Sequence, residues 1–125
     1  MLRNEKGFTL IEIIAVLVIL GILAAVAIPK YISMMDQSRI AAAQASIAEL
    51  KARSSNYYAS QMLSGAGANT PAAVQASIAA NSSVGSDFVL TVRVAGTSDI
   101  SITVTTVKNK SIPSTSGTWY YPTEI

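Results

Sequence analysis

A long apolar run near the N-terminus constrains this chain more than any other feature. Residues 8–28 have the sequence FTLIEIIAVLVILGILAAVAI, in which Thr9 and Glu12 are the polar exceptions. As an α-helix, this run would be about 31 Å long, which matches a bilayer hydrocarbon core of about 30 Å. We therefore predict a membrane-spanning helix here, and a single small globular domain in the rest of the 125-residue chain.

After Pro29, the pattern changes from uniformly apolar to amphipathic. Apolar and small side chains recur at spacings of three and four, which is typical of a helix with one buried face. They are Ile40, Ala43, Ile47, Leu50, Ser54 and Tyr57. Because the helical period resumes directly after the proline, we expect one helix that continues through Pro29, with a kink near residues 25–29. It should end by the glycine-rich residues 65–67, since glycine readily adopts a left-handed cap conformation.

The next part of the chain predicts a short helix and a β-hairpin. Thr70 and Pro71 are residue types that favour an N-cap and a first helical position, and this helix should close at Asn81. From there the hydrophobic period changes to two, over residues 88–94 and again over 100–105. Such alternation on either side of a turn predicts two antiparallel strands.

A third strand and a cover for the sheet complete the predicted fold. The segment TWYYP suggests a short strand around 118–122, after a loop at 111–117 that is rich in Ser, Pro and Gly. The apolar face of the sheet needs cover, and the amphipathic half of the long helix can supply it. The predicted fold class is α+β: a long N-terminal helix packed on an antiparallel sheet of about three strands.

Composition restricts the chemistry open to this chain. The sequence has no His and no Cys, so it lacks the commonest transition-metal ligands, the thiol nucleophile and any disulfide. The nine Lys and Arg residues, against seven acidic ones, form no basic run of the kind that binds phosphates, so nucleic acid is not indicated. Acidic residues beyond residue 80 are too sparse to specify a calcium site. We predict no enzyme activity, no metal and no cofactor.

Glu12 stands out, because a carboxylate inside a membrane-spanning helix costs about 2.5–3.5 kcal/mol unless it has a partner or a function. Around it lie the residues K-G-F-T-L-I-E, followed by the apolar run with Gly21 and Pro29. This segment resembles the N-terminus of the type IV pilin family, which includes the pseudopilins of type II secretion. The resemblance is close over residues 6–30 and loose for the order of helix and sheet.

The resemblance implies a processing pathway. A membrane-embedded prepilin peptidase would cut between Gly7 and Phe8, and Phe8 would then be N-methylated. The mature chain would wait in the bacterial inner membrane as a single-pass protein and then enter a periplasmic or extracellular filament of many copies. An inner-membrane assembly platform and an assembly ATPase would drive that step. Glu12 lies one helical turn from Phe8, so its carboxylate can pair with the amine that cleavage exposes, on its own chain or on a neighbour.

The same resemblance assigns roles along the chain. Gly21 and Pro29 would let the helix yield on assembly, since glycine and proline weaken a helix. The predicted divisions are a cleaved leader at 1–7, a membrane-spanning half of the helix at 8–29, an amphipathic half at 30–64, a connecting loop with a short helix at 65–87 and a sheet region at 88–125.

Two alternatives remain open. The chain could be a pseudopilin instead of a pilus subunit. It could also be a small secreted binding module, because Ala25-Val26-Ala27 resembles an ordinary signal-peptidase site, and a cut there would leave Ile28 as the first residue. In a separate reading, independent of the cleavage site, Glu12 lies near the headgroups and needs no partner.

Overall fold

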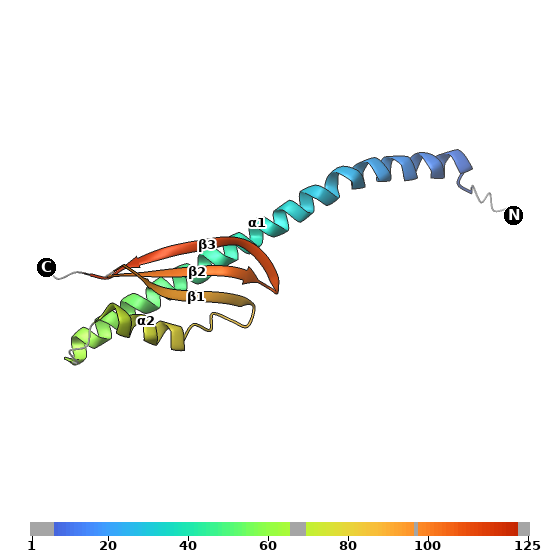
Figure 1. The fold of residues 1–125 in the computed structure, drawn as a ribbon. Coiled ribbons are helices and arrows are strands. Elements are labelled where there is room, and N and C mark those ends of the chain that lie inside the picture. The colour runs from blue at the N-terminus through green and yellow to red at the C-terminus, as the bar shows by residue number, and fades with distance from the viewer. Residues whose placement is uncertain (1–6, 66–69, 97, 123–125) are drawn as a thin grey trace, which may run out of the picture. The chain divides into compact units, whose positions relative to one another are not determined.

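The computed structural model describes residues 7–65, 70–96 and 98–122. Its elements in chain order are α1 (Leu10–Ser64), α2 (Pro71–Ala80), β1 (Phe88–Ala95), β2 (Asp99–Val107) and β3 (Lys110–Tyr120) (Figure 1). The chain divides into two compact units, Met1–Met35 and Asp36–Ile125. A long N-terminal helix and a three-stranded antiparallel sheet confirm the predicted α+β class.

The first unit contains the apolar part of α1. All of its described residues are exposed, although most are Ile, Leu, Val and Ala. By length and composition, α1 is apolar enough to cross a membrane, and an exposed apolar surface of this size is typical of segments that contact lipid or other helices. The helix continues through Pro29, as predicted. The kink near residues 25–29 stays a prediction.

The helix ends form as their sequences suggest. α1 ends at Ser64, and Gly65 follows with φ +67, a left-handed conformation that glycine adopts without strain. The glycine at 67 lies outside the described residues. In α2, the Thr70 hydroxyl accepts a hydrogen bond from the Ala73 N–H at 3.2 Å, and Asn81 forms the C-cap. The predicted short helix is therefore confirmed together with both of its caps.

The three strands form one antiparallel sheet in the order β1-β2-β3. The predicted hairpin is confirmed, with Val92 opposite Ile102 and Val94 opposite Ile100. Along β2, buried residues alternate with half-buried ones, because successive side chains point to opposite faces of a strand. One face of the sheet is therefore apolar and the other polar.

The prediction for the third strand was wrong in its start. β3 begins at Lys110, so residues 111–117 are part of a strand and not a loop. Two central residues connect β2 to β3, Lys108 and Asn109, with φ 50 and φ 57; positive φ at both is what a type I′ hairpin turn requires. Pro113 is tolerated because β3 is an edge strand, whose ladder is irregular opposite Val104–Thr106.

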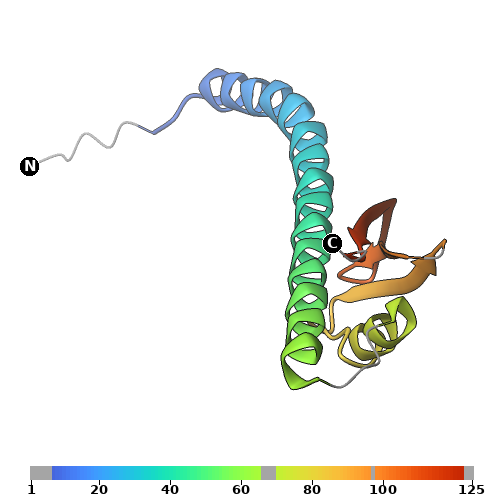
Figure 2. The same ribbon diagram turned by 90° about the vertical axis from the view of Figure 1, so that its left-hand side faces the viewer.

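The core of the second unit lies between the sheet, α2 and the later part of α1 (Figure 2). The predicted helix stripe supplies its helical side, with Ala43, Ile47, Leu50 and Ser54 buried and Ile40 and Tyr57 half-buried. The sheet contributes Ile100, Ile102, Val104, Val107, Ile112 and Trp119, and α2 contributes Val74 and Ile78. The amphipathic half of the long helix covers the sheet, as expected.

Gly117 permits the close approach of β3 to α1. A Cβ atom placed on Gly117 would lie 2.5 Å from Cγ2 of Ile47 and 3.0 Å from Cε of Lys51. Real Cβ atoms essentially never come so near another heavy atom. A side chain at this position would therefore force Ile47 or β3 to shift.

Candidate processing and assembly site

The predicted cleavage point lies just before the first helical turn. Gly7, Phe8 and Thr9 have no helical or strand structure, and α1 begins at Leu10. The Phe8 side chain is 80% exposed, and among the described residues, apart from the chain neighbours of Gly7, no heavy atom lies within 4 Å of a Cβ placed on Gly7. The peptide bond between Gly7 and Phe8 is thus flanked by open space.

Thr9 and Glu12 form a reciprocal cap on α1. The Glu12 N–H donates a hydrogen bond to the Thr9 hydroxyl at 3.3 Å. In return, the Glu12 carboxylate accepts from the Thr9 backbone N–H at 3.4 Å and from its hydroxyl at 3.5 Å. The Thr9 carbonyl accepts the first helical hydrogen bond, from the Ile13 N–H at 3.2 Å. This is a capping box, in which two backbone donors at the start of a helix are satisfied by side chains.

This cap was not predicted, although the sequence contains its signature, T-x-x-E before an apolar run. The cap gives Glu12 partners within its own helix. Negative charge is also favoured at a helix N-terminus, where backbone N–H groups are unpaired. The carboxylate therefore faces the backbone N–H of Thr9, the residue directly after Phe8.

Gly21 and Pro29, the other two predicted site residues, do not join this group. Both lie further along α1. A Cβ atom on Gly21 would meet nothing within 4 Å in the described part of the chain, apart from its own helix backbone, so packing against those residues does not require a glycine there. In a membrane or a helix bundle, a glycine at such a position lets a neighbouring helix approach closely.

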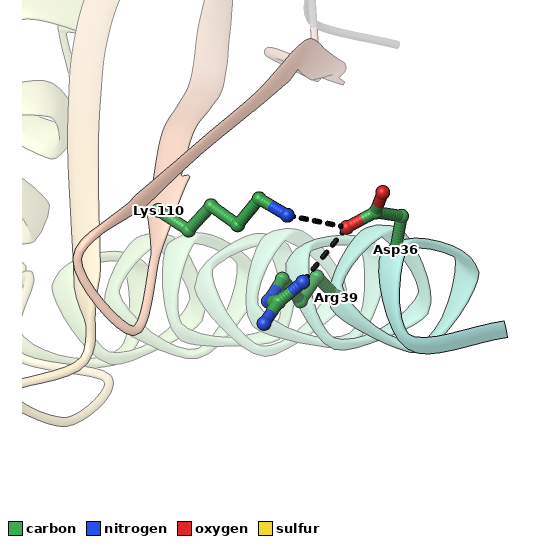
Figure 3. A network of polar contacts seen from close by, with 3 residues as sticks. All are labelled: Asp36, Arg39 and Lys110. Carbon is green, nitrogen blue, oxygen red and sulfur yellow. Dashed lines mark hydrogen bonds and ion pairs between the residues drawn. The ribbon is translucent and has the colours of Figure 1, made fainter. Parts of the chain in front are cut away.

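A second charged group lies where α1 enters the globular unit. Figure 3 shows Oδ1 of Asp36 between two cations: Arg39 Nη1 at 2.7 Å and Lys110 Nζ at 3.2 Å. The hydrogen bond from Lys110 holds the pKa of the Asp36 carboxyl below its ordinary value, and Arg39 acts in the same direction. Lys110 begins β3, so this ion pair joins the turn between β2 and β3 to α1.

Arg53 connects α1 to the end of α2. Its Nη1 donates to the Asn81 backbone carbonyl at 2.8 Å, and its Nε pairs with Glu49 at 3.0 Å. A cation at the C-terminal end of a helix is favourable, because the carbonyl groups there carry partial negative charge. Arg53 therefore helps to hold α2 against α1.

Comparison with known proteins identifies the N-terminal segment. Residues 2–28 match the family model of the prokaryotic N-terminal methylation motif. The type II secretion system core protein G of Pseudomonas aeruginosa is 48% identical over 50 residues, which cover 40% of this chain and 35% of that protein. The type IV narrow pilus major component PilA5 of Thermus thermophilus is 44% identical over 48 residues, which cover 38% and 41% of the two chains.

A third relative, the type IV major fimbrial protein FimA of Dichelobacter nodosus, is 53% identical over 36 residues, which cover 29% of this chain and 23% of FimA. The chain spans less than half the length of each of these relatives. No solved structure gives a significant match. At residues 2–28 the chain carries the N-terminal methylation motif, and over 48 to 50 residues it is similar to a type IV pilus major component and to a core protein of type II secretion.

Proposed function

We propose that the chain is the precursor of a structural subunit of a type IV pilus-type filament. One observation carries this proposal: the methylation motif at residues 2–28 coincides with the start of an exposed apolar helix that can cross a bilayer. In the precursor, that helix anchors the chain in the inner membrane. In the filament, the same apolar surface packs against other copies, while the α+β unit lies outside.

Processing by a prepilin peptidase is the first step. The enzyme cuts between Gly7 and Phe8, and the new N-terminal amine of Phe8 is then methylated. The exposure of Phe8 and the open space around Gly7 support this step, because a protease needs an accessible peptide outside regular structure. Glycine at position 7 also leaves room beside the bond to be cut.

Glu12 has two successive partners in this proposal. Before cleavage, its carboxylate caps α1 through Thr9, which offsets part of the cost of a charge at the membrane. After cleavage, a cationic amine stands at Phe8, next to the Thr9 N–H that Glu12 already faces. The carboxylate then pairs with that amine, on its own chain or on an adjacent copy, where the low dielectric strengthens the attraction. The pair sets the stagger between neighbouring subunits.

Filament assembly requires an α1 backbone that can deform and partner proteins that supply the energy for extrusion. Gly21 and Pro29 are the positions where the α1 backbone deforms most easily. The sequence has no P-loop to bind ATP, so an inner-membrane platform and an assembly ATPase drive extrusion. The chain itself acts as a structural protein and not as an enzyme, in keeping with relatives named as pilus and fimbrial proteins.

A second candidate function has its own support. The 48% identity to a type II secretion core protein favours a pseudopilin, which would form a short filament within the periplasm.

The length of the filaments tests both candidates. Cells that produce this chain with a prepilin peptidase and an assembly system are sheared, and the released material is examined by immunoblotting and electron microscopy. Long surface filaments that contain the chain support the pilus subunit. Short filaments confined to the periplasm support the pseudopilin. Release of an unassembled soluble protein that begins at Ile28 would overturn both.

A further inference from the structure

One flank of α1 forms a groove with the edge strand β3. The groove has a volume of about 230 Å³, and its walls are Gln44, Ile47, Ala48 and Lys51 of α1 and residues 115–117 of β3. Because β3 is the last strand of the sheet, half of its backbone N–H and C=O groups point away from β2. The groove is therefore open to an incoming segment.

Lys51 gives this groove a positive charge. Its side chain is half-buried, and its Nζ would lie 3.1 Å from a Cβ placed on Gly117, so the ammonium group lies over the β3 backbone. Among residues 7–65, 70–96 and 98–122, the cations in ion pairs are Arg39, Arg53 and Lys110. Lys51 pairs with no acidic residue in these ranges.

The opposite flank of α1 lies beside the loop at residues 81–87, which joins α2 to β1 and carries one acidic residue, Asp87. Ser83 and Val84 of this loop line a second groove with Glu49 and Arg53. Asp87, at the end of the loop, is exposed. Its backbone carbonyl accepts from the Lys108 N–H at 2.7 Å, but within the described part of the chain its carboxylate forms no ion pair.

The strand order separates the two charges. Asp87 directly precedes β1, whereas the Lys51 groove is built on β3, at the other edge of the sheet. The remaining unpaired cations of this unit, in the described ranges, lie on the same side as Asp87. Arg93 belongs to β1, and the backbone of Lys108 is bonded to that of Asp87. Any ion pair between Asp87 and Lys51 would therefore have to join two copies.

We propose that Asp87 of one copy pairs with Lys51 of the next, with the exposed residues 85–87 lying in the groove of its neighbour. Gly85 and Ser86, the two residues before Asp87, are small and exposed, and they suit a narrow groove. Because each copy has one donor and one acceptor surface on different sides, the contact is heterologous, and it forms an open polymer when the rotation between copies does not close a ring. The inference rests on the proposed filament function and names the contact between its globular units.

Charge reversal tests this contact in filaments of the full chain. We expect Lys51→Glu and Asp87→Lys each to reduce the sheared filament yield at least about tenfold, since a like-charge contact replaces an attractive one. The double variant should restore most of the yield. Asp99→Lys, an equal charge change at another acid without an ion pair in the described ranges, serves as the matched control and should assemble normally. Circular dichroism of each variant excludes a folding defect as the cause.

Cysteine crosslinking provides a second readout, and the chain is suited to it because the sequence contains no Cys. Ser86 stands beside Asp87, and Ser116 lies in the groove wall. The double variant S86C/S116C should give a ladder of disulfide-linked oligomers in oxidised filaments, whereas either single variant should give none. Normal yields from both charge reversals, or filaments without a ladder, would overturn the contact while leaving the filament function intact. Absence of filaments from the unmodified chain would instead overturn the proposed function.

Discussion

Gly117→Ala should destabilise the globular unit by overpacking it. The added methyl group would lie 2.5 Å from Cγ2 of Ile47, a core side chain that is 5% exposed and cannot move without disturbing its neighbours. The Lys51 side chain can move aside, because only its far end, Cε and Nζ, comes near the added methyl group. Overpacking of this kind costs about 1–3 kcal/mol, and the lower backbone entropy of unfolded Ala returns about 0.4–1 kcal/mol. We expect a net loss of about 1–2 kcal/mol in the free energy of unfolding.

Thermal unfolding of the full chain in detergent, followed by circular dichroism, measures this loss. For a small domain it corresponds to a fall in Tm of about 4–16 °C. Repeating the substitution in an Ile47→Leu background tests the cause, since leucine has no methyl group at the Cγ2 position. There the cost of Gly117→Ala should shrink by at least half. An equal loss of stability in both backgrounds, or no loss in either, would refute the steric argument.

Four further predictions follow from the charged residues and the cleavage point. Glu12→Ala should leave cleavage intact and abolish filaments, measured in sheared fractions, because the Phe8 amine loses its partner; wild-type yields would contradict this. Gly7→Leu should block processing, seen as a precursor of unchanged size on a gel. Arg53→Met should lower the free energy of unfolding by about 0.5–1.5 kcal/mol, and Glu49→Gln, which keeps the bond from Arg53 to Asn81, should cost less. Asp36→Asn should destabilise the domain at neutral pH and not in acid. Because folding lowers the pKa of Asp36, its carboxylate stabilises the folded state at pH values above the ordinary pKa of 3.8. That stabilisation is lost as the pH falls through the lowered pKa. Urea unfolding at both pH values checks the sign.

Local signals in the sequence were sufficient for most of the fold. Thr70 and Pro71 predicted the start of α2, and the change of period at Phe88 predicted the hairpin, because caps and alternation depend on neighbours in the chain. β3 was placed too late for the same reason. Its turn, Lys108–Asn109, has no glycine, and Pro113 suggested a loop. Backbone pairing with β2 nevertheless holds residues 111–117 as a strand, against the loop preference of their sequence.

The candidate site divides in a similar way. Gly7, Phe8 and Glu12 could be proposed from a short contiguous motif, and the cap between Thr9 and Glu12 could have been found from the same letters. The bonds from Lys110 to Asp36 and from Arg53 to Asn81 join residues far apart in the chain. They depend on how the sheet and α2 pack against α1, so no spacing in the sequence predicts them.

The N-terminus of the mature protein tests the central claim most directly. The chain is produced with a prepilin peptidase, purified from the membrane or from filaments, and analysed by intact-mass and fragment mass spectrometry. We predict a protein that begins at Phe8 and carries one methyl group on its N-terminal nitrogen, so that a cationic amine stands beside Glu12. A protein that retains Gly7 and the leader, or one that begins at Ile28, would contradict the account.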